Sequence, residues 1–112
     1  MVKPYKETIY KNFIIRILDV NSDVSNFVWH RDKLNRIVIP VCGEDWKFQF
    51  DNELPDNIKI FKEIIIQKNI YHRVIKGTTP LKIYIYETDK NLDSRLITKI
   101  KKIAKDAYNS NI

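Results

Sequence analysis

The sequence predicts a mainly β fold of antiparallel strands, followed by one amphipathic helix at the C-terminal end. Short apolar runs rich in β-branched and aromatic residues recur about every ten residues through the first two-thirds of the chain, and residues typical of turns separate them. From residue 92 on, the apolar residues follow the spacing of one helical stripe instead. With 112 residues, the chain is long enough for one domain with one core.

The apolar runs place eight strands. We expect them at residues 13–20, 27–30, 36–42, 46–50, 58–60, 63–67, 71–75 and 81–87. Many short strands at regular spacing favour an antiparallel barrel or sandwich over a parallel sheet with crossover helices. We therefore expect residues 1–112 to form a single domain, with a barrel over about residues 13–87 and a helix over about residues 92–109 that covers one side of it.

Alternation within a strand indicates which side chains point inward. In residues 46–50, Trp-Lys-Phe-Gln-Phe, the aromatic side chains share one face and the polar ones the other, which is typical of a half-buried strand. Because aromatic residues dominate burial in small β cores, core packing is the expected role, and ligand contact the alternative, for Trp29, Trp46, Phe48, Phe50 and Tyr71.

Composition narrows the function classes. The 20 Lys and Arg residues outnumber the 14 Asp and Glu residues, and this net charge of +6 favours anionic partners. The single cysteine, Cys42, excludes an intramolecular disulfide and a zinc–thiolate cluster, and we expect it to be a buried, unreactive thiol. No apolar run reaches the ~20 residues that span a bilayer. These features together predict a cytoplasmic protein with no membrane partner.

The candidate chemistry centres on the two histidines. His30 and Asp32 are two residues apart, so extended backbone would point both side chains to the same side. His30, Asp32, Arg36 and Gly43 also stand where the first motif of the cupin superfamily places two ligand histidines, an acidic ligand and a glycine. The sequence resembles that superfamily over about residues 25–87.

A second stretch carries the same resemblance. The second cupin motif reads Pro-x-Gly-x-x-His-x-x-x-Asn, and its named positions are held here by Gln67, Asn69, His72 and Lys76. Phe61 stands where cupins usually have a further glycine. His30, Gly43 and His72 match the family by identity, and the other motif positions depart from it.

The resemblance implies a double-stranded β-helix, the small antiparallel barrel of the cupins, with ligands at its mouth that often hold Fe, Mn, Ni or Zn. His30, Asp32 and His72 would then be the metal ligands. Two imidazoles and one carboxylate form the set that suits Fe(II) or Mn(II) and leaves coordination positions open, so the ion would act as a Lewis acid or oxygen binder. Cupins include both enzymes and non-enzymatic sensors, so the resemblance does not decide whether this protein is an enzyme.

Arg36 replaces the glutamate ligand of the family with a permanent cation that cannot ligate metal. Its planar fork can hold a carboxylate or phosphate, so we expect Arg36 to bind an anionic small molecule, with help from Gln49, Tyr71 or Arg73. Asp32 and Arg36 could instead pair with each other in a cavity that holds no metal.

The alternative function is therefore a metal-free binding or accessory module, of the kind a phage could encode, that captures an anionic ligand or a partner protein. Exposed strand edges in so small a sheet make a homodimer an additional expectation. Nucleic acid is not an expected partner, because the lysines of the predicted helix are read as a solvated face and no helix-turn-helix pattern is present.

Overall fold

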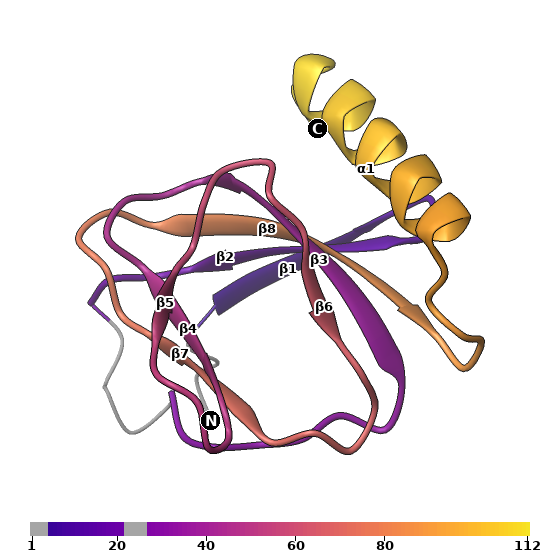
Figure 1. Ribbon diagram of the computed structural model, residues 1–112. Helices are drawn as coiled ribbons and strands as arrows, with labels where there is room; N and C mark the ends of the chain where they lie inside the picture. The colour runs from indigo at the N-terminus through magenta and orange to yellow at the C-terminus, as the bar shows by residue number, and fades with distance from the viewer. Residues whose placement is uncertain (1–4, 22–26) are drawn as a thin grey trace.

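The computed structural model describes residues 5–21 and 27–112. Their strands form two antiparallel sheets, and one helix follows at the C-terminal end (Figure 1). The mainly antiparallel β fold with a C-terminal helix is confirmed. The elements are β1 Tyr5–Tyr10, β2 Phe13–Leu18, β3 Asn35–Cys42, β4 Lys47–Phe50, β5 Asp56–Asn57, β6 Ile64–Ile66, β7 His72–Ile75, β8 Leu81–Thr88 and α1 Ser94–Asn109.

The larger sheet has five strands in the order β1-β2-β8-β3-β6, and the smaller has three in the order β5-β4-β7. The last strand of the chain, β8, lies in the centre of the larger sheet, where it pairs with both β2 and β3. This arrangement places Glu87 of β8 directly opposite Arg36 of β3.

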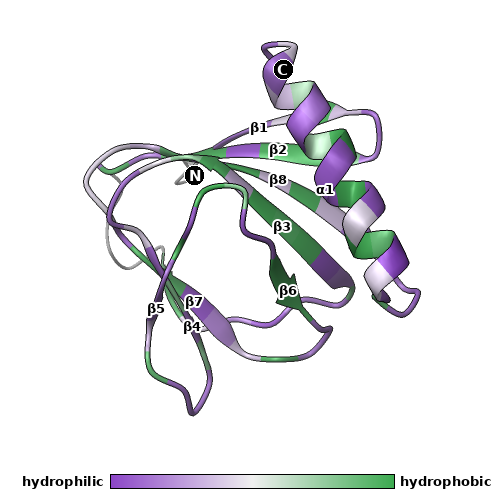
Figure 2. Cartoon of the chain, turned by 45° about the horizontal axis from the view of Figure 1, so that its top comes forward, coloured by the Kyte–Doolittle hydropathy of each residue, from purple (hydrophilic) through white to green (hydrophobic). Residues whose placement is uncertain are grey.

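The central strands of the five-stranded sheet are buried on both faces. Alternate residues of β3 point to opposite sides: Ile37 and Ile39 pack with Ile100 of α1, whereas Val38 packs with Phe48 of the smaller sheet. Figure 2 shows this as hydrophobic residues along β3 and a mixed, amphipathic α1 that lies over the larger sheet. The molecule therefore has three layers, and its second core lies between the two sheets.

The helix α1 begins and ends within two residues of its predicted bounds. Asp93 caps it, because its carboxylate accepts a hydrogen bond of 2.8 Å from the backbone N–H of Leu96. Ile100, Ala104 and Ala107 form the buried stripe. No helix in residues 5–21 and 27–112 has the length and apolar character needed to cross a bilayer.

Two strand assignments from the sequence are wrong, and one strand was missed. Residues 27–30 form only a single bridge at His30, and Val28 and Trp29 are exposed, because no continuous partner strand runs beside them. The predicted strand at 58–60 lies at residues 56–57 instead, since β4 ends its pairing there and no strand partner follows. The edge strand β1 was not predicted. It alternates weakly, and its Ile9 is 72% exposed.

Three predictions of burial are also wrong. Cys42 is exposed, because a register shift between Pro40 and Cys42 ends the regular pairing of β3 with β8. Trp29 and Tyr71 do not join the core but lie at the surface. Trp46 and Phe48, in contrast, are buried between the sheets as expected.

Candidate metal centre

His30 and His72 face each other across a two-residue antiparallel bridge. The backbone N–H of His30 donates to the carbonyl of His72 at 3.0 Å, and that of His72 donates to the carbonyl of His30 at 2.9 Å. Directly opposite residues of an antiparallel pair project their side chains to the same side. The two imidazole rings accordingly lie edge to face, with centroids 4.4 Å apart.

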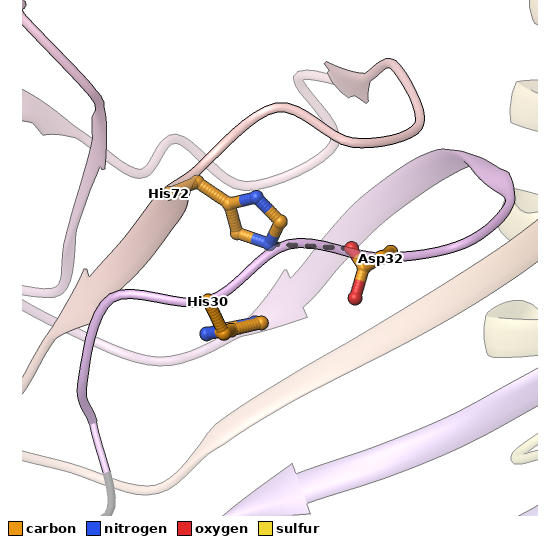
Figure 3. A group of neighbouring side chains, drawn as sticks. All are labelled: His30, Asp32 and His72. Atoms are coloured by element: carbon orange, nitrogen blue, oxygen red, sulfur yellow. Dashed lines mark ion pairs between the residues drawn. The ribbon is translucent and has the colours of Figure 1, made fainter.

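Asp32 completes the cluster from the same segment as His30 (Figure 3). One ligand atom from each of His30, Asp32 and His72 lies within 4.8 Å of the other two. His72 is buried and Asp32 is partly buried, whereas His30 lies at the exposed side of the cluster. The structure thus brings together the three residues that the sequence proposes as metal ligands.

Both imidazoles are held by the same kind of hydrogen bond. His30 Nδ1 donates to the carbonyl oxygen of Val28 at 3.0 Å, and His72 Nδ1 donates to that of Ile70 at 2.8 Å. A carbonyl oxygen can only accept, so in each neutral ring the proton sits on Nδ1 and the lone pair on Nε2. Backbone bonds of this kind commonly orient metal-binding histidines.

His72 Nε2 lies 3.3 Å from Asp32 Oδ2, the contact drawn in Figure 3. Asp32 Oδ2 is buried and has no well-formed hydrogen bond to any described residue. With the His72 proton on Nδ1, two electron-rich atoms would face each other in a low-dielectric setting, so a positive centre between them is needed. A proton or a metal ion can supply it.

Burial raises the pKa of the Asp32 carboxyl, but a hydrogen bond from His72, which requires a proton on Nε2, and the positive charge of Arg36 outweigh it, so the pKa lies below its ordinary value. Asp32 is therefore an ionised carboxylate at neutral pH, the form that binds metal. Its other oxygen, Oδ1, lies 3.4 Å from Arg36 Nη1.

Asp32 can pair with Arg36 and face a metal site at the same time, although the sequence analysis treats these two roles as alternatives. Oδ1 pairs with Arg36, while Oδ2 faces His72. Arg36 also has a partner that the sequence analysis missed: its Nε donates to Glu87 Oε2 at 2.8 Å. The spacing of Arg36 and Glu87 in the sequence gives no hint of this pair, because it depends on which strands are neighbours.

The cluster opens into a cavity of about 360 Å³ between the two sheets. Arg36 lines this cavity together with His30, Asp32 and His72, as the sequence predicts. Twelve of the seventeen lining residues are apolar, so the polar groups are confined to a small part of the wall. Arg16 of β2 is the one remaining polar residue of the described lining, and it pairs with Glu7 through its Nε at 2.8 Å.

Gln49, Tyr71 and Arg73, the other predicted substrate contacts, do not line this cavity. On β7, Arg73 points away from the side that carries His72 and Val74, and its Nε donates to Gln49 Oε1 at 2.8 Å. Its guanidinium lies 4.8 Å from the ring centre of Trp29. Tyr71 is 43% exposed beneath Arg31. Their role in substrate binding stays a prediction.

The donor set fits a divalent metal ion. Metal–ligand bonds of about 2.1 Å put neighbouring ligands about 3 Å apart, and His72 Nε2 and Asp32 Oδ2 already have nearly this spacing. Side-chain shifts of about 1–2 Å would close all three atoms around one ion. Two imidazoles and one carboxylate on one side leave the opposite coordination positions open.

Solved structures share this architecture. A cupin-2 domain protein from Shewanella frigidimarina superposes with a TM-score of 0.55 at 14% sequence identity, over 75% of this chain and 79% of that one. A cupin-like protein from Thermotoga maritima gives a TM-score of 0.52 at 14% identity, over 85% of this chain and 81% of that one. The protein has the cupin fold.

The cupin fold of this chain is also similar to that of Fe(II) HppE, with a TM-score of 0.55 at 13% identity over 75% of this chain. The match covers 48% of HppE, so this chain spans about half of that protein's length. No protein-family model matches the sequence, and no curated protein matches it at a significant level. The likeness shows the fold, and the function has to be argued from the site.

Two residues that stand where the resemblance to cupins places a glycine have the backbone that glycine adopts most readily. Phe61 has a φ of 62° and Asn69 a φ of 66°, both in the left-handed region. Asparagine tolerates this region better than most residues, whereas phenylalanine is strained there. Phe61 is held by packing, with its ring centre 5.5 Å from that of Tyr108 on α1.

Proposed function

We propose that this cupin-fold protein binds one divalent metal ion, Fe(II) or Mn(II), through His30, Asp32 and His72, and that an acidic small molecule binds beside the ion. The observation that carries the proposal is the facing pair of His72 Nε2 and Asp32 Oδ2. Asp32 Oδ2 is buried without a good hydrogen-bond partner in the described structure, and an ion shared with His72 Nε2 would satisfy it.

The remaining contacts hold the three proposed ligand side chains in position before a metal ion binds. The carbonyls of Val28 and Ile70 fix the two imidazoles, so little side-chain entropy is lost when the metal binds. Arg36 holds the second oxygen of Asp32 and thereby sets the direction of the first. An ion held at this wall of the cavity supplies Lewis-acid chemistry to a bound molecule.

The choice of metal follows from the ligands. A set of two histidines and one carboxylate with open positions is typical of Fe(II) sites, and Mn(II) also suits carboxylate and imidazole donors. Zn(II) and Ni(II) bind the same donors, so they are the competing outcomes of a metal analysis.

The test is metal analysis of protein purified without a histidine tag and reconstituted without oxygen. We expect about one equivalent of Fe(II) or Mn(II) per chain. His30→Ala should lower metal occupancy strongly and leave the melting temperature nearly unchanged, because His30 is exposed. Asp106→Asn on α1 is the matched control, since this exposed carboxylate lies outside the cluster.

Wild-type protein that stays free of metal after reconstitution with Fe(II), Mn(II), Ni(II) and Zn(II) would contradict the proposal. The metal-free binding module would then be the better account. Equal occupancy in wild type and His30→Ala would show that His30 is not a metal ligand.

A further inference from the structure

The cavity beside the cluster has an apolar wall that a metal site alone does not require. On the larger sheet the wall includes Val38, Ile83 and Ile85, and on the smaller sheet Phe48 and Val74. The volume of about 360 Å³ is near the lower end of the range for ligand pockets, about 300–1,000 Å³. A small molecule with few polar atoms fits this space.

The charges around the cavity restrict the polar part of such a molecule. Both lining arginines already have acidic partners: Arg16 pairs with Glu7, and Arg36 pairs with Glu87 and Asp32. With neutral histidines, the two positive and three negative charges of these described residues sum to one net negative charge. A divalent ion would reverse this to one positive charge, which a single carboxylate would neutralise.

Resting on the proposed function, we propose that the ligand is a small monocarboxylate with an apolar body. Its carboxylate lies at the His30, Asp32 and His72 end of the cavity, and its hydrocarbon part lies along the apolar wall. A sugar or other polyhydroxylated compound would leave its hydroxyl groups without partners against Ile83 and Phe48.

Ile58 lines the cavity beside the end of β4 that lies away from His72. Its backbone N–H donates to the carbonyl of Trp46 at 2.9 Å, at one end of β4, whereas Phe50 at the other end pairs with His72. Ile58 lines the cavity, and Ile60 in the same loop does not. The depth available to a hydrocarbon chain is thus set by residues far from the metal ligands.

The experiment is a calorimetric titration of Mn(II)-loaded and metal-free protein with acetate, butanoate, hexanoate and 1-hexanol. We expect affinity for the loaded protein to rise about fourfold with each added methylene, which is the effect of burying a CH₂ group. Hexanoate should bind at least about tenfold tighter than 1-hexanol, which has the same chain without the charge.

The matched variants are Ile58→Phe and Ile60→Phe. Ile58→Phe should lower hexanoate affinity about tenfold, because the larger side chain fills the part of the cavity away from the metal ligands. Acetate affinity and Mn(II) content should stay unchanged. Ile60→Phe should change none of the three. If Ile58→Phe melts too low to be assayed, Ile64→Phe on β6 fills the same cavity from another strand.

The outcomes separate the two proposals. Affinity that does not depend on chain length, or 1-hexanol binding as tightly as hexanoate, would overturn the ligand class even if Mn(II) is bound. Equal hexanoate binding with and without Mn(II) would overturn the charge argument for a carboxylate ligand, because the acid would then bind without the ion. The Mn(II) content of the protein tests the proposed metal site separately. No binding of any acid to either form would overturn the ligand class.

Discussion

Arg36 lies directly opposite Glu87 across the β3–β8 pair, and its Nε donates to Glu87 Oε2 at 2.8 Å. The same guanidinium reaches Asp32 Oδ1 at 3.4 Å. One cation thus holds two carboxylates at the wall of the cavity, and only 16% of its side chain is exposed. This arrangement orients Asp32 and leaves its Oδ2 facing His72, where a metal ion would bind.

Replacing Arg36 by leucine should destabilise the protein by about 3 kcal/mol, because two partly buried carboxylates would lose their cation. Urea denaturation measures this loss. The double variant Arg36→Leu, Glu87→Leu should recover part of it, since an apolar pair replaces the charged one. If Arg36→Leu alone is as stable as wild type, Arg36 is hydrated and does not hold the two carboxylates.

Phe61 provides a test of stored backbone strain. Phe61→Gly and Phe61→Ala both remove the ring that packs on Tyr108, so both should be less stable than wild type. Alanine keeps the strain of a φ of 62° and glycine does not, so the alanine variant should be less stable than the glycine variant by about 1 kcal/mol. Thermal melts compare the two, and equal stability would mean that the loop relaxes.

The contact between Glu63 and Lys101 should make part of the stability depend on pH. Lys101 Nζ lies 2.9 Å from Glu63 Oε1 and joins α1 to the segment before β6. The hydrogen bond from Lys101 lowers the Glu63 pKa below its ordinary value, and burial opposes this only in part. The contribution is therefore full above the pKa of the unfolded chain and is lost as the pH falls through the lowered pKa of the folded one.

Lys101→Ala should accordingly cost about 0.5 kcal/mol at pH 7, and the difference from wild type should shrink below pH ~4. Lys102→Ala is the control, because Lys102 is exposed on the same helix. Urea denaturation at both pH values checks the prediction. A Lys101→Ala deficit that persists unchanged in acid would assign the effect to lost packing of the lysine stem.

The sequence predicts best where a pattern is local. The alternation in residues 46–50 and the helical stripe after residue 91 depend on backbone period alone, and both correspond to observed elements. His30 and Asp32 converge because a spacing of two in extended backbone is also a local property. Their meeting with His72 was implied only by the resemblance to cupins.

The errors come from pairing, which a single sequence does not show. Residues 27–30 have an apolar pattern but only one bridged residue, and β1 has a weak pattern but a complete partner in β2. The Arg36–Glu87 pair likewise depends on β8 lying beside β3. Gln49 and Arg73 lie on the strand face away from this cavity, and their role in substrate binding stays a prediction.

The most direct test of the central claim is a crystal structure of protein soaked with Mn(II), with anomalous data that locate the ion. We expect one strong anomalous peak about 2.0–2.2 Å from His30 Nε2, Asp32 Oδ2 and His72 Nε2, with Arg36 still paired to Asp32 Oδ1. A peak elsewhere on the chain, or none at this cluster at saturating Mn(II), would contradict the account.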